Sequence, residues 1–295
     1  MGTMMTPPLV VGVDGSDSSL QAVDWAVDEA ARHGLSLRLV HASLWERYEG
    51  ALPSSDLDRP SGRVLAEHIV ASAAERATRR DPDVKVFTDV IPEDAVETLL
   101  REGDNASALV TGSRGRGGLP GLLLGSVGLA VASRAHCPVI VVRGDSTGLA
   151  GGHERILLGA GDPVTSGEAV RFAFREAETR GCVLDVVRAW RRPVHDVTGP
   201  PEPDDASACL HQERAAALLH TVLHNAAADH PGVRVRGATV EGPARRILVR
   251  RSAAADLVIV GARRRAGHFG LQLGRVSHTL LHHAYCPVAI VPQPV

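Results

Sequence analysis

Four glycines stand within seven residues between Gly112 and Gly118, in the sequence GSRGRGG. An apolar run follows, and Gly125-Ser126 then opens a second apolar segment. The residues directly before the glycines, SALVT, are typical of a short buried strand. Glycine lets several backbone amides point to one place, and a helix N-terminus adds partial positive charge. The stretch therefore predicts a strand, a loop and a helix start that could hold a phosphate group, although a plain surface loop would also tolerate these glycines.

The bulk composition narrows the classes of protein that this chain can belong to. It has 295 residues, enough for two domains. The net charge of −2 argues against binding to nucleic acids or anionic membranes, and an aromatic content of 3% argues against stacking on nucleic-acid bases. The four cysteines form no C-x-x-C pair, so we expect neither a metal cluster nor a disulfide framework. No signal-like start and no long apolar run are present. We expect a cytoplasmic protein with no metal site.

Apolar runs alternate with segments of helical period through the first half of the chain. Strands are expected at 9–13, 35–42, 84–90, 107–111 and 139–142. Helices are expected at 20–31, 64–79, 94–102 and 125–134. Alternating strands and helices predict an α/β fold with a doubly wound parallel sheet, and the fully apolar strands agree because both of their faces would be covered.

The second half repeats this pattern with constant spacing within each block. Residues 156–159, 183–189 and 256–260 align with the first, second and fourth strands, and 261–274 aligns with 112–125 without a gap. This indicates a tandem duplication, with one domain at 1–145 and a second at 153–295. The sequence between them, GDSTGLAGGH at 144–153, has the composition of a flexible linker.

The spacing G-x2-G-x9-G-S, together with a first strand that ends near Asp14, resembles the ATP-binding branch of the UspA-like universal stress protein family. The resemblance implies two five-stranded units of the adenine nucleotide alpha-hydrolase-like fold, with strand order 3-2-1-4-5. ATP, with or without Mg²⁺, would lie across the carboxyl ends of strands 1 and 4. The last strands, 139–142 and 288–291, would pair the two units as an intramolecular pseudo-dimer, and further homodimer formation is left open.

The resemblance also assigns roles in ATP binding. The glycine loop would approach ribose and phosphate, the segment 125–127 would hold phosphate oxygens, Asp14 would meet the ribose, and the backbone of Ala42 would meet the adenine edge. The full expected set is Gly12, Val13, Asp14, Ala42, Gly112, Ser113, Arg114, Gly115, Arg116, Gly117, Gly118, Gly125, Ser126 and Val127. Asp14 and Ser126 could instead be helix N-caps, and Arg114 and Arg116 could be solvated surface residues.

The second copy departs from this pattern at three positions. Gly161 replaces the aspartate, Arg264 replaces the second loop glycine, and Arg275 replaces the serine. A degenerate second site would consist of Gly159, Gly261, Arg264, Gly274 and Arg275. Either this copy is structural scaffold or its arginines bind an anion differently. We favour loss of ATP binding, which predicts one nucleotide per chain.

The sequence favours a binding module over a catalyst. No G-x-x-x-x-G-K-[ST] motif is present, and no general base or Mg²⁺ carboxylate set stands near the glycine loop. We therefore expect a nucleotide-dependent regulatory module of the stress response. The alternatives are a slow ATPase, a nucleotide-dependent transferase or a nucleotide-free interaction protein. His41 is expected in the core, and His278, His282 and His283 at the surface. The polar segments 43–62 and 191–211 are expected to be mobile loops, either lids or excursions.

Overall fold

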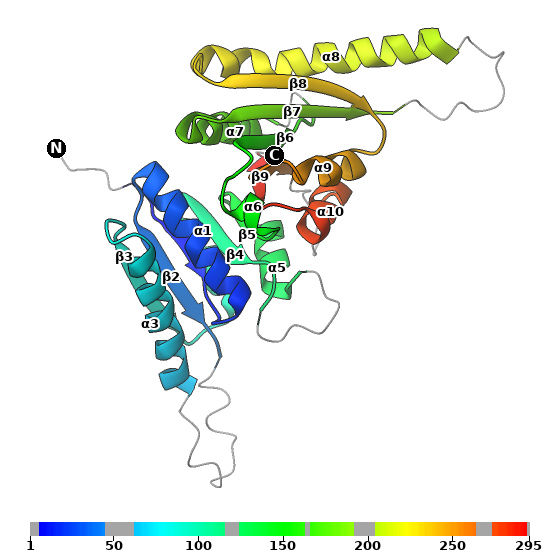
Figure 1. Ribbon diagram of the computed structural model, residues 1–295. Coiled ribbons are helices and arrows are strands. Elements are labelled where there is room, and N and C mark those ends of the chain that lie inside the picture. Colours follow the sequence, from blue (N-terminus) through cyan, green and yellow to red (C-terminus); the bar gives the residue numbers. More distant parts are fainter. Residues whose placement is uncertain are drawn as a thin grey trace. The chain divides into compact units, whose positions relative to one another are not determined.

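A computed structural model describes residues 6–44, 62–115, 124–162, 166–191, 204–263 and 273–293 (Figure 1). The chain forms two compact units, Met1–Arg143 and Gly144–Val295. Each contains five parallel strands, in the order β3-β2-β1-β4-β5 in the first unit and β8-β7-β6-β9-β10 in the second. The doubly wound α/β fold with strand order 3-2-1-4-5 is therefore confirmed in both halves.

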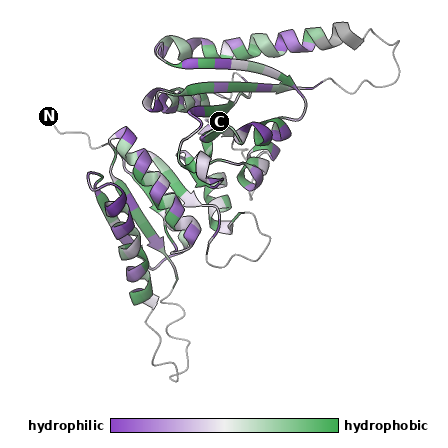
Figure 2. Cartoon of the chain, viewed as in Figure 1, coloured by the Kyte–Doolittle hydropathy of each residue, from purple (hydrophilic) through white to green (hydrophobic). Residues whose placement is uncertain are grey.

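The elements of the first unit follow the sequence pattern closely. They are β1 (Leu9–Gly12), α1 (Asp17–His33), β2 (Leu37–Ala42), α3 (Gly62–Arg80), β3 (Val86–Ile91), α4 (Ala95–Gly103), β4 (Ala108–Gly112), α5 (Ser126–Arg134) and β5 (Val139–Val142). Helices α1 and α3 pack together over the sheet, and α4 and α5 form a second pair. The middle strands are hydrophobic and buried, since Val11, Leu39 and Leu109 are all 0% exposed (Figure 2).

The second unit repeats this order after one short additional helix. Its elements are α6 (Ser146–Leu149), β6 (Arg155–Gly159), α7 (Gly167–Arg180), β7 (Val183–Trp190), α8 (Asp204–Asp229), β8 (Arg234–Glu241), α9 (Ala244–Ser252), β9 (Leu257–Arg263), α10 (Arg275–His283) and β10 (Val288–Gln293). In the segment 191–211, residues from Asp204 onward belong to α8, so this part is helical rather than the mobile loop expected. Residues 192–203 of that segment, and residues 45–61 of the other, lie outside the described residues.

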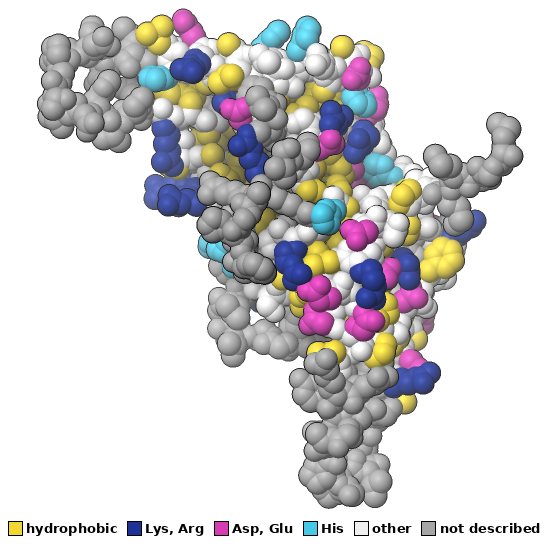
Figure 3. All heavy atoms as spheres, turned by 180° about the vertical axis from the view of Figure 1, so that it is seen from behind, with side chains coloured by type: hydrophobic (Ala, Val, Ile, Leu, Met, Phe, Trp, Pro, Cys, Tyr) yellow, Lys and Arg dark blue, Asp and Glu magenta, His cyan; other side chains and the backbone are white. Residues whose placement is uncertain are grey.

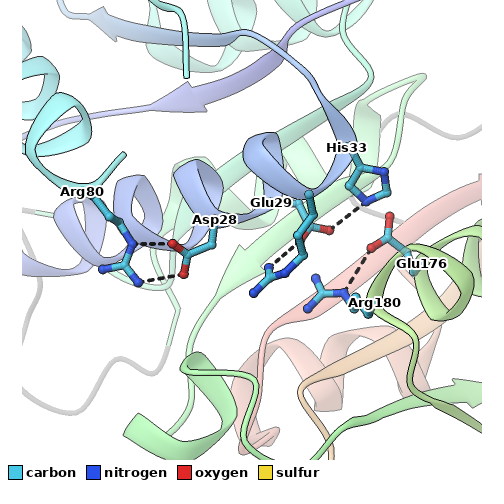
Figure 4. A network of polar contacts seen from close by, with 7 residues as sticks. Asp28, Glu29, His33, Arg80, Glu176 and Arg180 are labelled. Atoms are coloured by element: carbon cyan, nitrogen blue, oxygen red, sulfur yellow. Dashed lines mark hydrogen bonds and ion pairs between the residues drawn. The ribbon is translucent and has the colours of Figure 1, made fainter. Parts of the chain in front are cut away.

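Helix α1 begins and ends where its caps place it. The Ser16 side chain accepts from the Ser19 amide at 3.2 Å, and Gly34 ends the helix in the left-handed conformation, with φ of 62°. On the solvent side, Arg80 of α3 reaches Asp28 of α1 with two guanidinium nitrogens, at 2.6 and 2.7 Å (Figure 4). Such half-exposed pairs fix the helix pairing more than they add stability.

Figure 4 also shows two ion pairs that run along single helices. Glu29 of α1 contacts His33 one turn later at 3.4 Å. Glu176 of α7 contacts Arg180 one turn later, also at 3.4 Å. Both pairs join residues four apart, the spacing that places two side chains on the same face of a helix.

The expectation of a flexible linker at 144–153 is wrong. Asp145 caps the short helix α6 by accepting from the Gly148 amide at 2.9 Å, and its own amide donates to the Tyr285 carbonyl at 3.2 Å. Gly144 has φ of 113° and lies so close to the Tyr285 backbone that a side chain there would overlap it. Glycine is needed at this position because the backbone of Tyr285 leaves no room for a side chain. The glycine content of the segment therefore reflects close packing and not flexibility.

The four cysteines differ sharply in accessibility, which gives a first testable expectation. Burial raises the pKa of the Cys137 thiol to about 11 and also raises that of Cys182, while Cys286 is 0% exposed. Cys209 on α8 is exposed. Because the thiolate is the reacting form, a thiol reagent at pH 8 should modify Cys209 rapidly and the other three only after denaturation. Cys209→Ser should abolish the fast phase, and a second fast thiol in the native protein would contradict this assignment.

No helix in the described ranges is both long and apolar enough to cross a membrane.

Candidate functional site

A cavity of about 400 Å³ opens in the first unit where β1 and β4 end. The helix after β1 and the helix after β4 belong to different helix pairs, so this is the switch point at which such sheets bind ligands. Ten residues of the expected set line it: Gly12, Val13, Asp14, Ala42, Gly112, Arg114, Gly115, Gly125, Ser126 and Val127. Three segments far apart in the sequence are thereby brought to one place.

Other lining residues were not predicted. They are Ser19, Val40, Ala95, Leu99, Thr111, Leu124 and Gly128. Ala95 and Leu99 stand four residues apart on α4 and face the cavity together, forming an apolar wall with Val40. Leu99 is 4% exposed and packs over Gly12, where an added Cβ would lie 2.9 Å from the Leu99 Cδ1 atom. A side chain at position 12 would therefore require Leu99 to shift within this wall.

Asp14 lies at the mouth of the cavity and is held by its own loop. Its Oδ1 accepts from the Ser16 amide at 3.0 Å and from the Ser16 hydroxyl at 2.6 Å. The N-cap of α1 is Ser16, so the alternative that Asp14 caps this helix is wrong. The Asp14 Oδ2 lies 2.6 Å from the position that a Cβ on Gly115 would take. The carboxylate thus faces the glycine loop, and that approach needs glycine there.

Helix α5 begins at the cavity without a side-chain cap. Its N-cap is Gly125, whose backbone is extended at φ −73° and ψ 151° and whose amide donates to the Ser113 carbonyl at 2.8 Å. Ser126 is the first helical residue, so the alternative that Ser126 is the N-cap is wrong. The residues of the first turn, 126–128, all line the cavity. Their amides and the helix dipole make this end of the cavity electropositive.

The start of the glycine loop is held against α1. A Cβ on Gly112 would lie 2.6 Å from the backbone carbon and oxygen of Ser18. The Ser18 hydroxyl accepts from the Arg114 amide at 3.1 Å and lies 3.3 Å from the Ser113 hydroxyl. Arg114 is exposed and lines the cavity, whereas Ser113 is not among the lining residues and instead joins the loop to α1 and α5. Arg116, Gly117 and Gly118 lie outside the described residues.

His41 is a core residue, as expected. It is 8% exposed, and its Nδ1 lies 2.7 Å from the Val13 carbonyl, to which the ring N–H donates. This bond holds the end of β1, directly before Asp14, against β2.

The corresponding edge of the second unit is built differently. Gln293 of β10 accepts from the Glu168 amide at 3.1 Å, so it caps the start of α7, and its side chain fills the space beside Gly261. Gly159 packs under Leu248, as Gly12 packs under Leu99. Arg275 lines a cavity of this unit, whereas Gly159, Gly261 and Gly274 are not among its lining residues. Arg264 lies outside the described residues, and Gly274 is the N-cap of α10.

Comparison with known proteins decides the family. The model of the universal stress protein family matches residues 5–143 and again residues 152–292. The chain belongs to the universal stress protein family. A universal stress protein of Mycobacterium tuberculosis strain H37Rv is 33% identical over 292 residues, which cover 97% of each chain. One from Mycolicibacterium smegmatis is 30% identical over 296 residues, covering 96% of each chain. The similarity to these relatives thus extends through both units of the chain.

The fold of the universal stress proteins is also found by structural comparison. The crystal structure of a universal stress protein from Archaeoglobus fulgidus matches with a TM-score of 0.66 and 17% identity. The match covers 98% of this chain and 99% of that one. At this identity the likeness concerns the fold.

Proposed function

We propose that the first unit binds ATP and that the protein acts as a nucleotide-dependent regulatory module of the stress response rather than as an efficient catalyst. The observation that carries the proposal is the uncapped start of α5 at a cavity of about 400 Å³. A helix start without a cap has free amide donors that a phosphate group can satisfy. Membership of the universal stress protein family agrees with this choice.

The lining of the cavity suits the parts of the nucleotide in order. Adenine would lie against Val40, Ala95 and Leu99, with the Ala42 backbone at its edge. The ribose hydroxyls would donate to Asp14. The phosphates would meet the amides at the start of α5, and Arg114 would offset part of their charge. Glycine at positions 115 and 125 leaves room for the ligand to approach the backbone closely.

The same lining argues for binding over hydrolysis. Asp14 is the one carboxylate among the described lining residues, and one of its oxygens is engaged by Ser16. Mg²⁺ would therefore arrive with the ATP phosphates rather than on a protein carboxylate set. A slow ATPase would show steady-state phosphate release that Ser126→Ala abolishes, and that result would replace the binding role with a catalytic one.

Calorimetric titration of the full chain with ATP and Mg²⁺ tests the assignment directly. We expect one ATP per chain, because in the second unit Gln293 fills the space beside the corresponding loop glycine and Arg275 replaces Ser126. Two equal sites would show that the second unit kept ATP binding. Absence of any heat, together with no ATP-induced rise in melting temperature, would favour a nucleotide-free interaction protein.

Three further expectations belong to this role. We expect the protein to act in the cytoplasm. Pairing of the two halves through their last strands, and assembly of chains into a homodimer, stay predictions, and sedimentation equilibrium measures the latter.

A further inference from the structure

The second unit has its own cavity, of about 380 Å³, at the carboxyl edge of its sheet. The cavity lies between the end of β7 and the starts of α9 and α10. Its described lining includes Arg191, Arg245 and Arg275, together with Trp190. When the two copies of the sequence are aligned, Arg275 corresponds to Ser126 of the first unit and Ala244 corresponds to Ala95. The cavity is therefore the counterpart of the first site, with arginine added from three elements.

None of these three guanidinium groups forms an ion pair with another described residue. Arg191, Arg245 and Arg275 are exposed, and among the described residues no carboxylate lies within ion-pairing distance of any of them. No described lining residue is acidic. The start of α10 adds to this positive potential, since its N-cap is Gly274 and no side chain caps it.

The contrast between the two copies shows how this charge arises. On α4 of the first unit, Glu97 pairs with Arg134 of α5 at 2.7 Å. The corresponding position on α9 is Arg246, next to Arg245, so an acidic position has become basic. Charged side chains of both signs lie at the surface, as Figure 3 shows for one face of the molecule.

We propose that this cavity binds a compact anion that carries several phosphate groups. Three arginines that line one cavity can offset several negative charges, and guanidinium groups form paired hydrogen bonds with phosphate oxygens. The first turn of α10 would contribute amide donors, as α5 does in the first unit. Val187 and Leu248, which correspond to Val40 and Leu99 of the proposed adenine wall, are not among the described lining residues of this cavity, and Trp190 is its one aromatic lining residue. The shared chemistry of the ligand is therefore its phosphate chain, whether inorganic or part of a nucleotide.

Inorganic triphosphate, titrated into the full chain by calorimetry, is the probe for this site. The titration uses the variant Gly125→Asp, which places a carboxylate in the first site, so the result does not depend on ATP binding there. We expect triphosphate binding to persist in this variant. Adding Arg245→Ala or Arg275→Ser should weaken it at least about tenfold, since each removes a charged hydrogen-bond donor.

Arg250→Ala is the matched control, because Arg250 lies on α9 and is exposed but does not line this cavity. It should leave triphosphate affinity unchanged, and urea unfolding should show that all of these surface variants fold. If ATP displaces triphosphate, the natural ligand of this cavity is a nucleotide. If ATP does not displace it, the natural ligand is a phosphate compound that is not a nucleotide. Both results support the site. No triphosphate binding, or an equal loss in Arg250→Ala, overturns it.

Discussion

Replacing Gly125 by aspartate should strongly weaken ATP binding by the first unit while making that unit slightly more stable. The backbone at Gly125 is extended, as an N-cap requires, and a Cβ there would have its nearest neighbours at 3.6–3.8 Å, so the side chain fits. The carboxylate would accept from the free amides of α5 and stabilise the helix by about 0.5–1 kcal/mol. The same carboxylate would occupy the place of the phosphate oxygens and repel them, which should weaken ATP binding about a hundredfold.

Calorimetry with ATP and urea unfolding followed by circular dichroism measure these two effects separately. Their opposite signs matter, because a variant that merely misfolds would lose both binding and stability. Gly274→Asp is the matched control: Gly274 is the N-cap of α10, and nothing lies within 4 Å of its added Cβ. It should stabilise the second unit and leave the ATP titration unchanged. Unaltered ATP affinity in Gly125→Asp would show that α5 does not receive the phosphates.

The parts of the site that could be predicted from the sequence are those that the backbone itself provides. The glycine spacing and the ends of β1, β2 and β4 locate the loop and the start of α5, because parallel strands bring their carboxyl ends to one edge. Val40, Ala95 and Leu99 were missed, since their apolar pattern equally fits the core of any α/β unit. One signal was available in the sequence: Ala95 and Leu99 are four residues apart on α4 and therefore face the same side of the helix.

The local chemistry of capping could not be decided from the sequence. Asp14, Ser16 and Asp17 are all good N-cap residues within four positions, and the backbone conformation alone selects Ser16. The start of α7 posed a harder problem, because the side chain that caps it, Gln293, stands 125 residues after Glu168 in the sequence. The arginine substitutions predicted that the second site had changed. They could not show that Gln293 fills the space beside Gly261 or that the corresponding cavity, next to α9, is lined by three arginines.

The two loop glycines should respond differently to the smallest possible side chain. In Gly112→Ala the new Cβ would lie 2.6 Å from backbone atoms of Ser18, and α1 is fixed by its cap and its buried face, so the first unit should lose about 2–3 kcal/mol of unfolding free energy. In Gly115→Ala the close neighbour is Asp14 Oδ2, the end of a side chain that can rotate away. Stability should then fall by less than about 1 kcal/mol, as is usual for substitutions that avoid the core.

The ATP affinity of Gly115→Ala should nevertheless drop, because the carboxylate that would accept from the ribose is displaced and the loop backbone is held further from the phosphates. Urea unfolding and ATP calorimetry on both variants separate these roles, with Gly34→Ala, at a helix end remote from the cavity, as a control whose strained φ costs stability but not affinity. If Gly115→Ala bound ATP like the wild type, Asp14 and Gly115 would be packing partners alone, and the ribose would have to be held by other residues. If Gly112→Ala were as stable as the wild type, the contact between the loop and α1 would not be the reason for glycine at that position.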